Sequence, residues 1–224
     1  MAETVRGSSP EITRSSGRRS INNLQRSASL FLVKTVFAAV LALICIVLPP
    51  YPFIPIQMSL ISTTVIGIPS FVLALEPNKE RVKGNFLVNV LSRSLPASGA
   101  IIVFLLFELV LGRFLGHEFD EISTVCMIIT IVVGLALIFR ISQPLTALRK
   151  LLLVSMAVLV VLACTVCGSF FHVVALPFDV AVATVVFCVL AVLLFERFST
   201  GFERNADSNR LLLAAVERIE GGVP

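Results

Sequence analysis

The sequence is poor in charged residues. Only 14% of its 224 residues are Asp, Glu, Lys or Arg, whereas 57% are hydrophobic. A soluble domain is about one-quarter charged and about half apolar, so this composition excludes an ordinary soluble globular protein. The apolar residues fall in blocks of about 20, the length that crosses the hydrocarbon core of a bilayer. We therefore predict an integral membrane protein.

The sequence shows no sign of a secretory signal peptide or of a disulfide framework. No apolar core closely follows a basic start and no small-residue cleavage site is present, so residues 1–27 do not resemble a signal peptide. The net charge of +4 follows from the loop positions described below and needs no nucleic-acid partner. The cysteines all lie in apolar segments and are interpreted as small packing residues, not as a disulfide framework: Cys45, Cys126, Cys164, Cys167 and Cys188.

The apolar segments predict an all-α fold, a polytopic membrane bundle with six transmembrane helices. We expect a cytoplasmic arm and helix lead-in over residues 1–27, a transmembrane domain over 28–196 and a cytoplasmic tail over 197–224. The six spans lie at about 28–49, 55–75, 95–116, 123–140, 151–169 and 178–196.

Two further helix starts are expected outside the membrane. The arm is predicted to be flexible up to about Ser16 and helical from there into the first span. In the tail, Asp207 or Ser208 is placed to cap a short amphipathic helix, which would lie on the membrane, on a partner domain or in solvent.

Lys and Arg are distributed unevenly between the two sides of the predicted membrane. Of the 18 basic residues, 16 fall in the arm, in the second and fourth links between spans, or in the tail. Only Arg113 falls on the opposite side, and Lys34 lies inside span one. Because cytoplasmic loops carry an excess of basic residues, we expect a multi-pass protein with both termini in the cytoplasm.

The stretch 57–78 interrupts its own apolar pattern. Its first half is polar, and Gly67 and Pro69 lie in its middle. A proline inside a helix removes a backbone donor and kinks the helix. In a membrane, such an interruption occurs where protein or water satisfies the freed carbonyl, as in transporter ion sites. A kink that serves only packing is the alternative, since Gly and Pro are common in transmembrane helices.

The residues around the first two spans resemble a known family. Gly17-Arg18-Arg19-Ser20-Ile21-Asn22-Asn23 leads into span one, Pro55-Ile56-Gln57 opens span two, and Gly67-Ile68-Pro69 interrupts it before Glu76-Pro77-Asn78. These phrases resemble bacterial P-type cation-transporting ATPases, most closely the actinobacterial ATPase E type, which is associated with calcium. The resemblance covers residues 17–97 and implies the fifth and sixth membrane helices of a pump in the bacterial cell membrane. The later spans agree in number, length and orientation.

The catalytic motifs of that family do not occur in this sequence. It has no Asp-Lys-Thr-Gly, no Gly-Asp-Gly-x-Asn-Asp and no Thr-Gly-Glu motif. Phosphoryl transfer needs a nucleophile and positioned cations, so this chain alone should not hydrolyse ATP and needs no cofactor of its own. ATP and Mg²⁺ would serve the complete pump. The partners implied are the lipid bilayer, the missing N-terminal half of the pump and a transported cation, with Ca²⁺ as the candidate.

Two other functions are open. The chain could be a non-catalytic pump remnant or a membrane regulator that associates with an intact pump. It could also be a free-standing secondary transporter, although no inverted repeat is visible and few carboxylates lie inside the spans.

The resemblance also implies positions for an ion site. The usual cation-ligand positions fall on Thr35 and Ala38 in span one and on Ser62, Val65 and Ile66 in span two. A hard cation such as Ca²⁺ takes six to eight oxygens, usually with carboxylates among them, so carboxylates would have to come from the missing half. The ion-translocation candidates are Lys34, Thr35, Gln57, Ser59, Ser62, Thr63, Thr64, Gly67 and Pro69. The residues that would couple the site to the phosphorylation domain are Gly17, Arg18, Asn22 and Asn23.

Two charged residues lie inside apolar spans. Lys34 is predicted either to act as an internal cation that expels or replaces the transported ion, or to extend toward the cytoplasmic interface. Glu108 is predicted either to form part of a proton path, or to be a protonated or hydrogen-bonded residue used for packing.

Overall fold

The chain folds into helices joined by short connections. The computed structural model describes the backbone of residues 10–75 and 86–220 and the side chains of residues 24–75 and 89–205. The described backbone contains no strand. In order along the chain, its helices are α1 (Pro10–Cys45), α2 (Pro55–Ile61), the π-helix η1 (Ser62–Gly67), α3 (Ile68–Leu75), α4 (Phe86–Leu115), α5 (Phe119–Ile141), α6 (Ala147–Thr165) and α7 (Phe178–Glu220).

Six helical segments are long and apolar enough to cross a membrane, which confirms the all-α fold with six spans. The second span combines α2, η1 and α3 into one segment. The segments are Leu24–Cys45, Pro55–Leu75, Asn89–Leu115, Phe119–Ile141, Ala147–Thr165 and Phe178–Asn205.

The first span ends earlier than the sequence suggested. Helix α1 stops at Cys45, and the amide of Leu48 then closes a turn by donating to the Ile44 carbonyl at 2.9 Å. Pro49 and Pro50 have no amide hydrogen, and a residue before a proline avoids the helical conformation. The chain therefore leaves the helix before the two prolines.

The two helix starts expected outside the membrane are wrong. Helix α1 begins at Pro10 and not near Ser16, in keeping with the preference of proline for the first helical position. Helix α7 runs without interruption through Asp207 and Ser208, so neither residue caps a separate helix. No Gly or Pro lies between Gly201 and the end of α7, and nothing in the sequence there forces the helix to stop.

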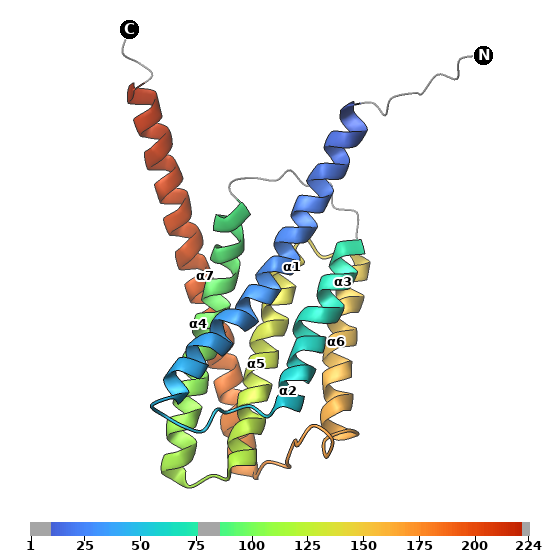
Figure 1. The fold of residues 1–224 in the computed structure, drawn as a ribbon, viewed down its shortest axis with the longest axis vertical. Helices are drawn as coiled ribbons and strands as arrows, with labels where there is room; N and C mark the ends of the chain where they lie inside the picture. The colour runs from blue at the N-terminus through green and yellow to red at the C-terminus, as the bar shows by residue number, and fades with distance from the viewer. Residues whose placement is uncertain (1–9, 76–85, 221–224) are drawn as a thin grey trace, which may run out of the picture.

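Helix α5 lies at the centre of the bundle and is its most buried span, whereas α6 is the least buried (Figure 1). Helix α4 packs against α1, α5 and α7, and α3 packs between α1 and α6. The largest fully buried side chains include Phe37 of α1, Leu105 of α4, Met127 of α5 and Phe195 of α7. Burial of these apolar surfaces holds the helices together.

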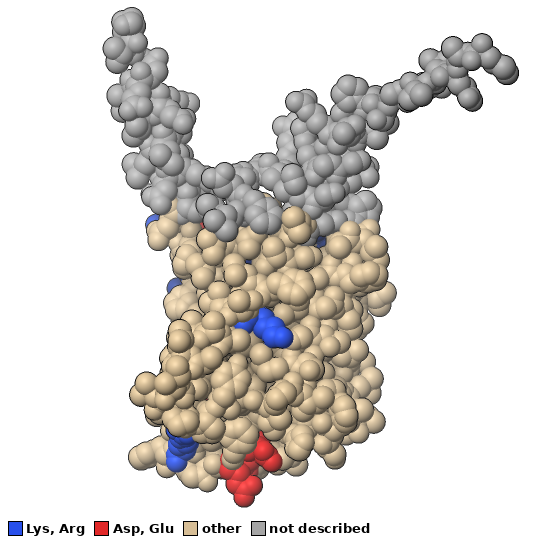
Figure 2. Space-filling view, viewed as in Figure 1, with Lys and Arg blue, Asp and Glu red and all other residues tan. Residues whose placement is uncertain are grey.

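The two ends of the bundle differ in charge. The start of α1 and the end of α7 project from one end, where α5 is joined to α6, and the 46–54, 116–118 and 166–177 connections lie at the other (Figure 1). Acidic side chains gather at this second end (Figure 2). At the first end, the Arg140 guanidinium of α5 bonds to Glu196 at 2.5 Å and to Glu203 at 2.8 Å, which fixes α7 against α5.

The turn between α5 and α6 is organised around a buried arginine. Arg149 is 4% exposed, and its Nη1 donates to the carbonyls of Ser142 at 3.1 Å and Pro144 at 2.9 Å. Thr146 caps α6 by accepting from the Arg149 amide at 3.4 Å. In the sequence, Arg149 contributes only to the prediction of membrane orientation. In the structure, its hydrogen bonds also fix the shape of the turn.

Candidate ion-translocation site

The second span contains a π-helix where the sequence predicts an interruption. In η1, the amide of Ile68 donates to the Thr63 carbonyl, five residues earlier, where an α-helix would use the residue four earlier. Pro69 follows directly and has no amide hydrogen to continue the pattern. The interruption is therefore present, and it takes the form of a widened turn. Short π-helical turns are frequent at functional sites.

A close approach of α5 holds this widened turn in place. Thr64, Val65 and Ile66 of η1 are buried, and Val65 points toward Gly134 of α5. A Cβ atom at Gly134 would lie 2.6 Å from Val65 Cγ1, closer than real side chains come. Only glycine lets the α5 backbone pack against η1 at this distance.

Lys34 contacts the π-helix directly. Its Nζ donates to Ser62 Oγ at 2.5 Å, and Ser62 Oγ in turn donates to the Met58 carbonyl at 2.5 Å. Lys34 lies ten residues after Leu24, where the membrane-length segment begins, so it is about 15 Å along this helix from that residue. The side chain is half-buried and bonded within the bundle.

The other candidate hydroxyl groups of the two spans each bond to their own helix. Thr35 donates to Phe31 at 3.1 Å, Ser59 to Pro55 at 3.2 Å, and Thr63 to Ser59 at 2.9 Å, and all three side chains are exposed. Thr64 is buried and donates to the Leu60 carbonyl at 2.8 Å. A hydroxyl that donates its hydrogen keeps oxygen lone pairs, so these groups can still coordinate a cation.

Gln57 lies apart from the other candidates. Its side chain is fully buried, its Oε1 accepts from Ser123 Oγ at 2.6 Å, and its Nε2 donates to the His172 carbonyl at 3.4 Å. The amide thus joins α2 to α5 and to the 166–177 connection. Sequence reasoning gave no role to Ser123, because a serine near the start of a span has no pattern that identifies its partner.

The structure therefore does not gather the candidate residues into one cluster. Lys34 and Ser62 meet at the start of the π-helix, which ends at Gly67, and Pro69 follows in α3. Ser59 and Thr63 line a groove of about 560 Å³ between the second span and α6, and Thr64 faces the interior. The positions Val65 and Ile66 carry apolar side chains. The side chains of Gly17, Arg18, Asn22 and Asn23 lie outside the described residues.

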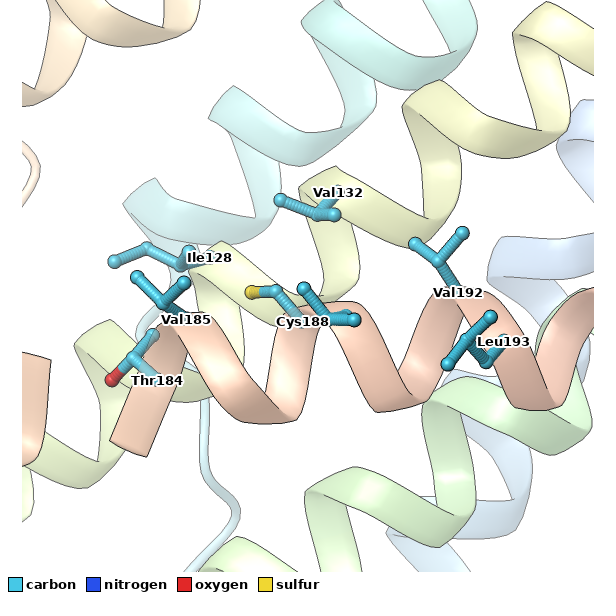
Figure 3. Close-up of a pocket in the computed structure, with 8 residues that line it drawn as sticks. Ile128, Val132, Thr184, Val185, Cys188, Val192 and Leu193 are labelled. Carbon is cyan, nitrogen blue, oxygen red and sulfur yellow. The ribbon is translucent and has the colours of Figure 1, made fainter. Parts of the chain in front are cut away.

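The described side chains form no cluster of three or more His, Cys, Asp or Glu residues that could hold a metal ion. A second groove of about 450 Å³ runs between α5 and α7 (Figure 3). Its walls are apolar apart from Thr184, which donates to the Val180 carbonyl at 2.7 Å. This second groove offers no charged group for an ion.

Comparison with known proteins finds similar sequences among bacterial cation-transporting ATPases. The chain is 37% identical over 147 residues to the probable cation-transporting ATPase exp7 of Streptococcus pneumoniae, and 33% identical over 144 residues to the calcium-transporting ATPase CtpE of Mycobacterium tuberculosis. A similar protein of Mycolicibacterium smegmatis, also named calcium-transporting ATPase CtpE, is 32% identical over 152 residues. The chain is a homologue of bacterial cation-transporting ATPases. The resemblance to P-type pumps drawn from residues 17–97 is confirmed.

The similarity covers 57–62% of this chain, more than residues 17–97 alone. The chain matches only 18–19% of the length of these ATPases, so it corresponds to about one-fifth of each relative. No family model matches the sequence, and no solved structure matches the fold.

Proposed function

We propose that this chain forms the C-terminal transmembrane part of an ATP-driven P-type cation pump. It contributes part of the ion-translocation site through α1, α2 and η1, and α4 to α7 support that site. The observation that carries the proposal is the hydrogen bond between Lys34 and Ser62 at the π-helix of a chain related to cation-transporting ATPases.

The proposed role of Lys34 is that of an internal cation. The Lys34 ammonium is close to the hydroxyl and carbonyl oxygens that a transported cation would use. Two positive charges in one low-dielectric site repel each other, so the ammonium favours release of the ion. Ser62 holds the ammonium when the ion is absent.

The remaining parts of the pump lie on other polypeptide segments. The chain carries none of the family's phosphorylation or nucleotide motifs, so ATP and Mg²⁺ act on the N-terminal part, which belongs to the same polypeptide or to a separate one. The carboxylates that Ca²⁺ prefers would come from that part as well. We place the complex in the bacterial cell membrane with both termini in the cytoplasm, following the distribution of Lys and Arg.

The first experiment measures the size of the native product. An antibody to residues 203–220 is used on an immunoblot of membranes from the source cells. A band far heavier than 24.3 kDa is expected if the chain is part of a complete pump. If the band lies at 24.3 kDa, the N-terminal part should copurify with the chain, and a chain that purifies alone contradicts the proposal.

The second experiment tests the Lys34 site in the pump so obtained. Substitution Lys34→Ala removes the competing charge, so the cation concentration that half-activates ATP hydrolysis should fall by about tenfold, equivalent to about 1.4 kcal/mol. Lys150→Ala, at an exposed position at the start of α6, serves as the matched control and should leave this concentration unchanged. Unchanged cation dependence in a well-folded Lys34→Ala pump would overturn the role of Lys34.

A further inference from the structure

Glu108 of α4 is the one acidic side chain that is buried in the part of the chain whose side chains are described. It is 3% exposed and lies within a membrane span. It precedes Leu115, the end of α4, by seven residues, which places it about 10 Å from that end of the bundle. The candidate ion site at η1 does not use it.

The carboxyl group lies where α4 and α5 approach each other. A Cβ atom at Gly112, one turn further along α4, would lie 3.3 Å from Glu108 Oε1 and 2.8 Å from Ile122 Cγ1 of α5. Gly112 therefore leaves the space that the carboxyl group occupies. Among the described side chains, none forms a hydrogen bond or an ion pair with Glu108.

The helices packed against α4 offer no counter-charge. Helix α5 presents the fully buried Cys126 thiol, one turn past Ile122. The other titratable or charged groups on these elements towards this end are Cys45 of α1, Arg113 of α4, which is exposed, and Cys188 and the exposed Asp179 of α7. The turn and the start of α5 add His117, Glu118, Asp120 and Glu121. Lys34 of α1 is bonded to Ser62.

These surroundings determine whether the carboxyl group of Glu108 is protonated or ionised. An ionised carboxylate in an apolar site without a partner is far more costly than the neutral acid, so such a group keeps its proton. Acidic residues inside membrane spans mark proton relays for this reason. We infer that Glu108 is a proton-binding site within the membrane, and that its proton exchanges with the end of the bundle that carries the 116–118 turn. This site is separate from the ion site at η1 and does not depend on the proposed function.

Infrared spectroscopy tests the inference directly. The complete chain is reconstituted at neutral pH in vesicles of ether-linked phospholipids, which have no ester carbonyl that would mask the signal. A protonated carboxylic acid gives a carbonyl stretching band at higher frequency than the carboxylate bands. Exposed Asp and Glu are ionised at this pH, so among the described acidic side chains Glu108 is the expected source of the band, which should be lost in Glu108→Gln.

Asp179→Asn is the matched control, because it removes an exposed acid at the same end of the bundle and should leave the band intact. Should Glu108→Gln not fold, labelling of glutamate with ¹³C at the side-chain carboxyl should move the band in the unsubstituted chain. Transfer to D₂O should shift the band as the proton exchanges. Absence of the band in the folded chain overturns the proton-binding site, and a band that D₂O never shifts overturns the exchange with the outer end.

Discussion

Gly134 of α5 and Val65 of η1 are so close that a single added methyl group cannot fit between them. The Cβ atom of an alanine at position 134 would lie 2.6 Å and 2.7 Å from the two methyl carbons of Val65. The widened turn of η1 thus packs directly against the backbone of α5 at Gly134. The Gly134–Val65 contact therefore acts on the same turn that Pro69 follows.

Gly134→Ala should destabilise the bundle by about 1–3 kcal/mol, the usual effect of overpacking a well-packed interior. Unfolding by a denaturing detergent measures this change. The companion substitution Val65→Ala should recover most of the loss, because it removes the atoms that clash. Gly201→Ala is the matched control: nothing lies within 4 Å of its Cβ position, and it should be neutral or slightly stabilising. Strict additivity of Gly134→Ala and Val65→Ala would contradict the contact.

Gln57→Leu should loosen the 166–177 connection. The substitution removes the bonds to Ser123 Oγ and to the His172 carbonyl and leaves a buried hydroxyl without its acceptor, at a cost of about 1–3 kcal/mol. Amide hydrogen exchange in residues 166–177 should become faster. Ser59→Ala, which removes an exposed hydroxyl bonded only within its helix, should leave exchange there unchanged. Equal exchange in the Gln57→Leu and parent chains would mean that the amide does not hold this connection.

Arg149→Ala should destabilise the turn between α5 and α6. Two charge-assisted bonds to the Ser142 and Pro144 carbonyls are lost, and each contributes about 1.5–3 kcal/mol. The free energy of unfolding should fall by about 2–4 kcal/mol. The neighbouring exposed Lys150→Ala should change it by less than about 0.5 kcal/mol. If the free energy of unfolding fell by a similar amount in both variants, the loss of positive charge at this end would explain the effect, and the hydrogen bonds of Arg149 would not be needed.

Tyr51 should titrate at higher pH than a free tyrosine. Burial against the bundle raises the pKa of its phenol above the ordinary value of 10.0, with a smaller contribution from Cys45. The phenol loses its proton first in the unfolded chain, so the stability from this residue is complete below pH 10 and falls as the pH rises further. Tyr51 is the only tyrosine and the chain has no tryptophan, so tyrosinate absorbance reports on it alone. Tyr51→Phe supplies the blank, and a midpoint at or below the ordinary value would contradict burial of the phenol.

The number and approximate positions of the spans could be predicted from the sequence because blocks of apolar residues are a local property. Lys34 was recognisable for the same reason: a charge inside such a block is visible without any structure. Its partner was not. Ser62 lies 28 residues away, and its identity depends on how α1 and the second span rotate against each other.

The interruption of the second span was only half predictable. Gly67 and Pro69 mark the place where a regular helix fails, but they do not select between a kink and a π-turn. That choice depends on packing against α5, where Gly134 admits Val65. In the tail, by contrast, the sequence predicts a helix start that the structure does not have. Asp207 and Ser208 are good capping residues, yet a cap forms only where the preceding chain leaves the helix, and nothing in α7 makes it do so.

Helix α7 is a single rod of 43 residues, about 65 Å long, whereas the hydrocarbon core of a bilayer is about 30 Å thick. The helix is therefore about twice as long as a span needs to be, and it continues past the span without a break. Arg140 ties the rod to α5 near the level where it leaves the bundle. A small change in tilt about that tie would swing the far end of α7 through several ångströms. The packing of α7 against α5 within the bundle thus determines where the C-terminal end of α7 lies.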